Sequence, residues 1–123
     1  MPVKDASKFT TESINVTATA AGASAQLLYA CPTNFSSVVS FLIISSGTVA
    51  NKDISIQFYH QETATYKYML RTYRMGANSV FVVINTPSLS LHQGDKLVCF
   101  TDSTGNFDVT VSVEEYFDPV RKL

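Results

Sequence analysis

The sequence predicts an all-β fold: a two-sheet antiparallel β-sandwich, jelly-roll-like, with about eight strands. Apolar residues recur at every second position through most of the chain, and clusters of Gly, Pro, Asn, Asp and Ser interrupt them at near-regular intervals. No segment has the apolar period of a helix. With 123 residues, 46% of them hydrophobic, the chain has enough apolar surface for one core, which predicts a single domain over residues 1–123.

The first half of the chain contains three predicted strands. Residues 14–19 alternate apolar and polar side chains, which is typical of a half-buried strand. Residues 26–31 form the second strand and end at Pro32, because proline cannot donate to a central ladder. Residues 38–46 are apolar on both faces, which predicts a central strand that is covered on both sides.

The second half continues the same pattern at short intervals. Predicted strands cover residues 54–59, 66–71, 80–84, 96–101 and 107–114, and Leu89 and Leu91 lead into the turn before residue 96. Turn-forming residues separate them, with Thr86-Pro87-Ser88 as one clear break and His92-Gln93-Gly94-Asp95 as another.

The two ends of the chain differ from the middle. Residues 1–11 are polar with little periodicity apart from Phe9, and residues 118–123 form a tail in which Pro119 ends the last strand. Two interpretations of the N-terminal segment stay open: a frayed terminus, or an arm that docks onto a neighbouring subunit.

Charge and composition exclude several classes of partner. The net charge of −1 gives no overall field that would hold the protein on nucleic acid or on an anionic membrane. The N-terminus lacks the apolar run of a signal peptide, so we expect a protein that is made and kept soluble in a cytoplasm and leaves it by lysis or assembly. Cys31 and Cys99 are then expected to stay reduced.

No pattern in the sequence indicates catalysis. His60 and His92 fall in separate predicted turns, where we expect solvated side chains, and no nucleophile-elbow motif is present. Glu114 and Glu115 are adjacent on a strand and therefore point to opposite faces, so they do not form a carboxylate pair, and we expect both to be ordinary solvated side chains at a strand end. We predict no catalytic residue, no cofactor and no enzyme activity.

Metal binding is equally unsupported by spacing. The four thiol and imidazole side chains lie singly along the chain, whereas zinc sites use close pairs. The segment from Asp102 to Asp108 has oxygen-bearing side chains at alternate positions around a glycine, which would suit calcium. The same residue types are typical of a hairpin turn, and the distal Glu of an EF-hand is missing, so we predict no metal site.

The most unusual local feature is an aromatic and basic stretch over residues 66–75. It concentrates Tyr, Arg and Met, which are enriched at the centres of protein interfaces. The candidate interface residues are Tyr66, Tyr68, Arg71, Tyr73 and Arg74. The alternative is an ordinary strand with one face in the core and one face in solvent.

Four segments resemble small β-sandwich virion proteins of tailed phages, over about residues 24–117. Residues 26–32 are similar to a Leu-Tyr strand that ends in Pro, and the apolar strand 38–44 follows. Residues 89–97 contain a Leu-x-x-Gly-Asp turn, and residues 109–114 resemble the closing strand with its late acidic residue. Cys31 departs from the aliphatic residue that is more usual before the proline.

The resemblance implies a capsid decoration or cement protein, or a tail, neck or fibre accessory protein. Its partners would be the major capsid protein or other virion proteins, and it would form a homo-oligomer, a dimer or trimer, located in the virion. It implies no catalysis, and the net charge of −1 predicts no nucleic-acid and no membrane partner. An alternative from another class is a carbohydrate- or host-receptor-binding module with Tyr59, Tyr66, Tyr68 and Tyr73 as its platform. A small hydrolase is disfavoured by the lack of an acid, base or metal cluster.

Overall fold

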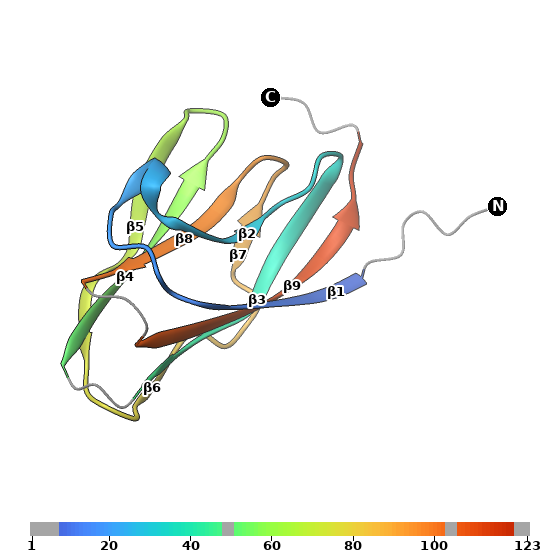
Figure 1. Cartoon of the computed structure of the whole chain (residues 1–123). Coiled ribbons are helices and arrows are strands. Elements are labelled where there is room, and N and C mark those ends of the chain that lie inside the picture. The colour runs from blue at the N-terminus through green and yellow to red at the C-terminus, as the bar shows by residue number, and fades with distance from the viewer. Residues whose placement is uncertain (1–7, 48–50, 103–105, 120–123) are drawn as a thin grey trace.

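A computed structural model describes residues 8–47, 51–102 and 106–119, which form nine strands and one short 3₁₀ helix (Figure 1). The strands are β1 (Lys8–Asn15), β2 (Gln26–Ala30), β3 (Phe35–Ser46), β4 (Lys52–His60), β5 (Thr65–Met75), β6 (Val80–Ile84), β7 (Leu89–Leu91), β8 (Lys96–Thr101) and β9 (Phe107–Phe117). The helix η1 covers Gly22–Ser24. Within these described ranges, no helix has the length and apolar composition needed to cross a membrane.

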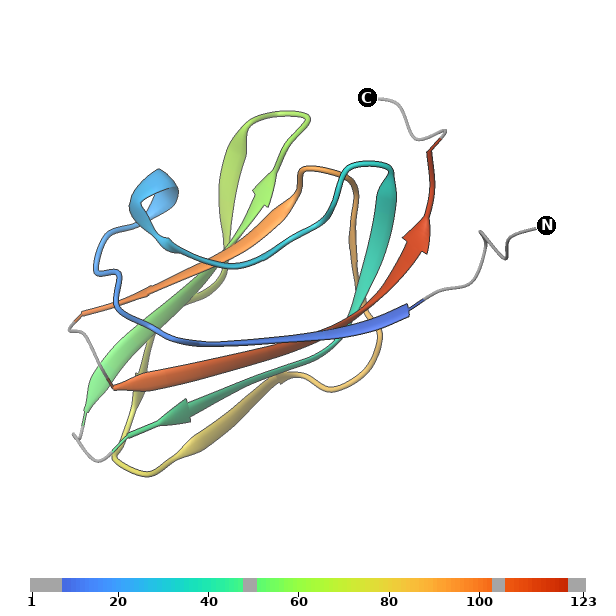
Figure 2. The same ribbon diagram turned by 45° about the vertical axis from the view of Figure 1, so that its right-hand side comes forward.

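Two antiparallel sheets pack face to face. The first, sheet A, has the strand order β1-β9-β3-β6, with β7 also paired to β3, and the second, sheet B, has the order β2-β8-β4-β5. Because the chain passes repeatedly between the sheets, strands distant in sequence become neighbours (Figures 1 and 2). This strand order is that of a jelly roll, so the predicted fold class is confirmed.

The ninth strand arises from a break within one jelly-roll strand. Both β6 and β7 pair with β3, β6 over its second half and β7 over its first. Pro87 lies between them, and proline cannot continue a β-ladder. The turn predicted at Thr86-Pro87-Ser88 therefore divides an edge strand and does not separate two sheets.

The core lies between the sheets and follows the predicted alternation. Every second residue of β9 from Phe107 to Val113 is fully buried, as are Ile54 and Ile56 of β4. Leu97 and Cys99 of β8 complete the facing layer. The period of two in the sequence thus corresponds to the inward faces of the central strands.

One prediction about β3 is wrong in part. The strand is central in sheet A, between β9 and the β6–β7 pair, but only its inner face is covered. Phe41 points outward and is 36% exposed, and its outward neighbour Ile43 lies opposite Val82 of β6. The apolar outward residues of these two strands therefore form an exposed patch and not a second buried layer.

The first strand also differs from the prediction. We expected a strand over residues 14–19, whereas β1 ends at Asn15 and begins at Lys8. All eight residues of β1 pair with β9, although most of them are polar. The strand is therefore defined by its hydrogen bonds at the edge of the sheet, and an apolar alternation is not needed. Residues 8–11 of the expected N-terminal arm are therefore part of the sheet, while residues 1–7 lie outside the described residues. Asp118 of the predicted tail accepts a hydrogen bond from Ser36, and residues 120–123 also lie outside the described residues.

Candidate interaction face

The outer face of sheet B carries two of the three tyrosines of the predicted interface, Tyr66 and Tyr68. Tyr66 of β5 is paired with Tyr59 of β4, and their ring centroids are 4.6 Å apart. Tyr68, two residues along β5, lies on the same face and contacts Phe100 of β8 with the rings edge to face at 6.3 Å. Side chains from three adjacent strands thus form one aromatic layer.

Two cations lie over this layer. The Arg71 guanidinium is 4.0 Å from the centre of the Tyr68 ring, and Lys96 Nζ is 5.2 Å from the centre of the Tyr59 ring. None of the ion pairs found among the described residues includes either cation. We call this surface the aromatic–cationic face. It consists of Tyr59, Tyr66, Tyr68, Arg71, Lys96 and Phe100.

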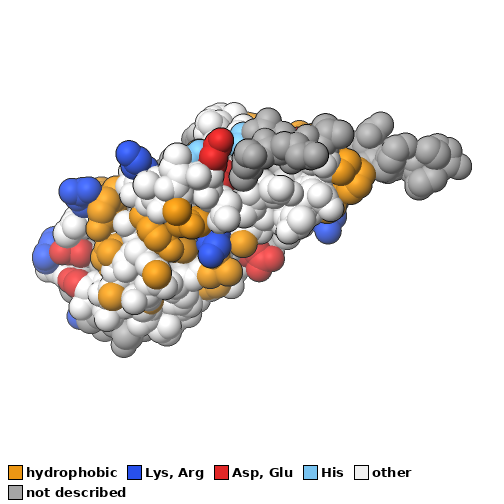
Figure 3. All heavy atoms as spheres, turned by 90° about the horizontal axis from the view of Figure 1, so that it is seen from above, with side chains coloured by type: hydrophobic (Ala, Val, Ile, Leu, Met, Phe, Trp, Pro, Cys, Tyr) orange, Lys and Arg blue, Asp and Glu red, His pale blue; other side chains and the backbone are white. Residues whose placement is uncertain are grey.

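Figure 3 views this side of the molecule, where hydrophobic side chains gather over sheet B and Lys and Arg side chains lie between and around them. The polar residue Gln57 of β4, which also points to this side, is covered by the chain near η1, because Gly22 N donates to Gln57 Oε1 at 2.8 Å. The aromatic–cationic face is therefore bordered by η1 and open beyond it.

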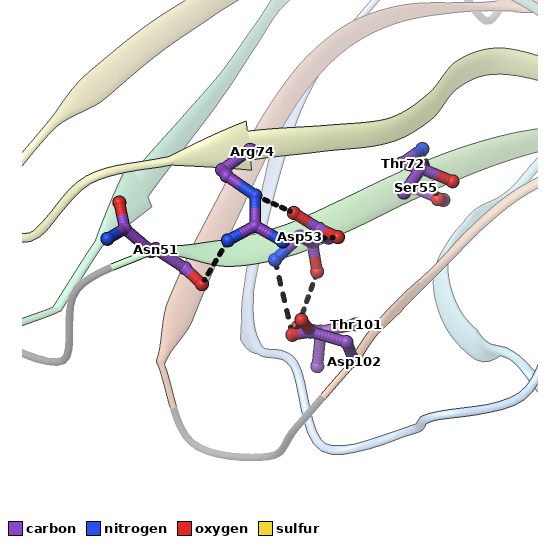
Figure 4. Close-up of polar contacts among 7 residues, drawn as sticks. All are labelled: Asn51, Asp53, Ser55, Thr72, Arg74, Thr101 and Asp102. Carbon is purple, nitrogen blue, oxygen red and sulfur yellow. Dashed lines mark hydrogen bonds and ion pairs between the residues drawn. The ribbon is translucent and has the colours of Figure 1, made fainter.

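Arg74 lies at one end of sheet B and is already paired (Figure 4). Its Nε is 3.1 Å from Asp53 Oδ1, and its guanidinium also donates to Asn51 O at 3.2 Å. The Asp53 backbone is held in turn by two side chains: Asp53 N donates to Asp102 Oδ1, and Thr101 Oγ1 donates to Asp53 O. The ion pair between Arg74 and Asp53 therefore links β5 to β4, and the Asp53 carboxylate largely neutralises the Arg74 charge.

Tyr73 does not share the face with the other predicted residues. Its ring stacks on Phe81 of β6, with centroids 4.4 Å apart and the planes 24° from parallel. The reason is a bulge: the register of β4 and β5 shifts between Ile54 and Ile56, and Thr72 has a φ of 49° there. The bulge turns Tyr73 toward β6 in sheet A.

Of the five predicted interface residues, the structure thus brings Tyr66, Tyr68 and Arg71 together. Two residues of this face were not predicted from the sequence: Phe100 and Lys96, which come from β8. Their alternation with Leu97 and Cys99 signals a shared outward face, but only the strand order shows that β8 lies beside β4.

A cleft of about 630 Å³ opens at the end of the sandwich where β4 and β7 finish. It is lined by Phe58, His60, Thr63, Thr65, Lys67, Ser90, His92 and Asp95. The two histidines, which were expected in separate solvated turns, therefore line one cleft. No group of three or more His, Cys, Asp or Glu side chains in the described part of the chain is arranged to hold a metal ion.

The buried carboxylate of this cleft has a structural role. Asp95 Oδ1 accepts from Gln61 N and Asp95 Oδ2 accepts from His92 N, both at 2.9 Å, so one side chain ties together two turns. Gly94 precedes it with a φ of 86°, a conformation that favours glycine. In the Leu-x-x-Gly-Asp turn, the glycine is thus explained by its positive φ and the aspartate by the two backbone N–H groups that it accepts from.

A second set of buried polar groups lies near β1 and β2 at the same end of the sandwich, where Cys31 N donates to Asp95 O. Tyr29 donates to Glu115 Oε2 at 2.5 Å, and Ser37 Oγ lies 3.0 Å from both Tyr29 Oη and Cys31 Sγ. Glu115 is 5% exposed and 3.6 Å from Lys8 Nζ, so the expectation of ordinary solvation at this strand end is wrong for it. Burial raises the pKa of Tyr29, and the hydrogen bond to Glu115 raises it further, so the phenol stays protonated.

Both cysteines are free and buried. Burial raises the pKa of the Cys99 thiol to about 12, and burial also raises the pKa of Cys31. High pKa values keep both groups as thiols, which are poor nucleophiles.

No protein-family model matches the chain, and no curated protein sequence matches it. Among solved structures, the chain is similar to one from Bacillus endospore appendages, described as disulfide-linked pili, with a TM-score of 0.53 and 13% identity over 92% of this chain and 88% of that chain. A chain of the IBDV viral particle aligns with a TM-score of 0.49 and 9% identity over 94% of this chain and 36% of that chain. A chain of the Macrobrachium rosenbergii extra small virus particle aligns with a TM-score of 0.37 and 9% identity over 94% and 81%. The likeness to the appendage chain is one of fold.

Proposed function

We propose that this protein is a non-enzymatic structural subunit of a virus particle, and specifically a decoration or cement protein that binds the major capsid protein of a tailed phage. The observation that supports this most is the aromatic–cationic face. Arg71 and Lys96 rest on tyrosine rings without a carboxylate partner in the described residues, and Tyr68 remains 37% exposed. Tyr and Arg are the residue types that anchor protein interfaces.

A rigid sandwich suits this role physically. An interface of standard size covers about 800 Å² of each partner, roughly an eighth of the 6544 Å² surface of this chain. The outer face of sheet B would lie across adjacent coat subunits, with the tyrosine rings in apolar depressions and the two cations against acidic groups of the coat. The buried apolar area then raises the free energy needed to separate those subunits.

Two further observations support an assembled structural protein. The fold is similar to that of an appendage chain described as forming pili, over 92% of this chain. The sequence resembles small virion proteins of tailed phages over residues 24–117, including the turn that Gly94 and Asp95 build. In this proposal the protein resides in the virion as a homo-oligomer.

The test has two parts. Quantitative mass spectrometry of purified particles should give a copy number comparable to that of the major capsid protein. Recombinant protein should bind particles that lack it, and the double variant Tyr68→Ala/Arg71→Ala should bind at least about tenfold more weakly, since interface anchors of these types contribute more than 1 kcal/mol each.

The matched control is Tyr116→Ala. Tyr116 belongs to β9 of the other sheet and is 38% exposed, almost the same as Tyr68. Equal binding by the double variant and the control would overturn the assignment of the aromatic–cationic face, and absence of the protein from particles would overturn the virion role.

A tail, neck or fibre accessory protein of the same particle is the closest alternative, and a copy number far below that of the coat protein would favour it. A carbohydrate- or host-receptor-binding module is the alternative from another class. The adjacent rings of Tyr59 and Tyr66, with Tyr68 beside them, favour it because exposed aromatic rings can stack on sugars. Tyr73, which packs on Phe81, would take no part in that platform. Binding on a glycan array that is lost in Tyr66→Ala would support this alternative over the capsid role.

A further inference from the structure

The edge strands of the two sheets differ in how well they are protected. The pairing of β2 with β8, of β5 with β4 and of β6 with β3 each contains a register shift, and such bulges hinder the addition of another strand. The strand β1 is different, since its eight residues pair with β9 in one continuous register. Among edge strands of five or more residues in the described ranges, β1 alone has no irregularity.

The free side of β1 is open along most of its length. The strand pairs with β9 on one side, and near its end Gln26 Nε2 donates to Asn15 O at 3.0 Å. No backbone partner lies on that side from Lys8 to Ile14 among the described residues. In Figure 2, β1 lies at the rim of sheet A with β9 on its one paired side. Phe9 points outward from this strand and is 74% exposed, the highest value of any large apolar side chain that is described.

We infer that β1 pairs with β1 of a second copy of this chain, antiparallel about a two-fold axis, so that Thr10 lies opposite the partner's Thr10. The contact would join two A sheets into one continuous sheet. It deepens the proposed function, since it adds a contact between copies to a subunit that is proposed to bind the particle by its other sheet.

Charge selects this register from the alternatives. Residues that lie opposite each other in an antiparallel pair must point to the same face of the sheet. The pairing of the two strands can therefore be shifted only in steps of two residues. Lys8, Thr10 and Glu12 share the inner face beside a cleft of about 490 Å³ between β1 and β2. With Thr10 at the axis, Lys8 lies opposite the partner's Glu12, twice by symmetry. An axis at Thr11 leaves both charges opposite uncharged residues, and an axis at Glu12 places the two Glu12 side chains opposite each other.

The other face gives an independent reason for the same register. With Thr10 at the axis, Phe9 lies opposite the partner's Thr11 and diagonal to the partner's Phe9. Diagonal neighbours across an antiparallel pair are about 7–8 Å apart, which aromatic side chains can span. Two highly exposed phenylalanine rings would therefore cover each other. Lys8 Nζ lies 3.6 Å from Glu115 of its own chain, but its side chain is 68% exposed and can also reach a partner. None of the ion pairs among the described residues includes Glu12, so Glu12 is available to the partner's Lys8.

The contact is short, and we therefore expect a weak dimer. Five paired residues span about 17 Å, less than a standard interface needs, so dissociation constants in the micromolar range or weaker are expected. High local concentration on a particle would strengthen the pairing. In solution the dimer should depend on protein concentration.

The first experiment uses sedimentation of the full chain and two charge variants. Glu12→Lys and Lys8→Glu each place like charges opposite one another, and each variant alone should dimerise about tenfold more weakly than the unchanged chain. An equimolar mixture of the two variants pairs opposite charges at both positions, so it should form heterodimers about as strongly as the unchanged chain. Glu62→Lys, which changes the net charge equally in the β4–β5 turn, is the control and should dimerise normally.

The second experiment tests the register by oxidation. Thr10→Cys should form a disulfide-linked dimer, because directly opposed residues lie within disulfide reach. Ser13→Cys should not, since position 13 lies away from the axis. Cys31 and Cys99 are buried and do not compete. A monomer at all concentrations, no gain on mixing the charge variants, or equal cross-linking of both cysteine variants would overturn the inference. The particle-binding test changes Tyr68 and Arg71 on sheet B, whereas the dimer test changes residues of β1. Either proposal can therefore be contradicted without the other.

Discussion

Tyr29 and Glu115 join the two sheets through a buried hydrogen bond. Tyr29 comes from β2 of sheet B and Glu115 from β9 of sheet A, and each side chain is only 5% exposed. A carboxylate that is removed from water requires hydrogen-bond partners, and here the phenol and the more distant Lys8 ammonium are the partners. The contact fixes how one sheet sits on the other at the side where β1 and β2 lie.

Removing the phenol should therefore destabilise the fold. Tyr29→Phe leaves the Glu115 carboxylate buried without its hydrogen-bond donor, which costs about 1–3 kcal/mol of the free energy of unfolding. Urea unfolding followed by circular dichroism measures the change. The control Tyr116→Phe alters an exposed tyrosine and should stay within about 0.5 kcal/mol. Similar losses for both variants would contradict the role of the Tyr29–Glu115 contact.

The fold should also lose stability in alkaline solution. The pKa of the Cys99 thiol is raised from 9.0 to about 12 by burial, and burial raises the pKa of Tyr29 as well. Below about pH 9 the folded and unfolded chains hold these protons equally. As the pH rises from about 9 toward 12, the unfolded chain releases the Cys99 proton and the folded chain keeps it, so the free energy of unfolding falls by up to about 1.4 kcal/mol per pH unit for such a group.

Urea unfolding at a series of pH values measures this slope. Cys99→Ala removes one of the contributing groups and should make the slope shallower, even though it also lowers the stability at neutral pH. The comparison concerns slopes, so the cost of the small cavity does not affect it. A slope unchanged by Cys99→Ala would show that the thiol does not titrate differently in the two states.

Gly94 should be hard to replace. Its φ of 86° is unfavourable for other residues, and a Cβ there would lie 2.7 Å from Gln61 Cγ. Gly94→Ala should cost about 1–3 kcal/mol, because it combines backbone strain with a close contact. Gly76→Ala is the control, since a Cβ at that position would meet only Ser79 Oγ at an ordinary 3.6 Å. Thermal unfolding of both variants measures the difference. Equal melting temperatures for the two would contradict the role given to Gly94.

The sandwich could be predicted from the sequence because central strands show their burial directly. The alternating valines of β9 and the isoleucines of β4 have the same period in the sequence and in the core. The edge strand β1 escaped prediction because it has no buried face of its own and depends on hydrogen bonds to a strand about a hundred residues away.

The sites were harder to predict than the fold, for physical reasons. A bulge at Thr72 places Tyr73 and Arg71 on different surfaces, and no residue type in the sequence indicates that bulge. Glu115 looks like a solvated acid at a strand end, and only the approach of Tyr29 from the other sheet explains its burial. Long-range packing, which local patterns do not encode, therefore determined which predicted residues share a surface.

The pairing of β1 with β9 also sets the order in which the protein can be completed during synthesis. The strand made last lies between β1 and β3 and is the neighbour of both, so neither has that partner until the ribosome has added Phe117. At about 5–20 residues per second, sheet A therefore stays divided for several seconds after β1 emerges. We expect the nascent chain to depend on chaperones during that interval, and loss of the last strand by premature termination would leave two open strands ready to aggregate.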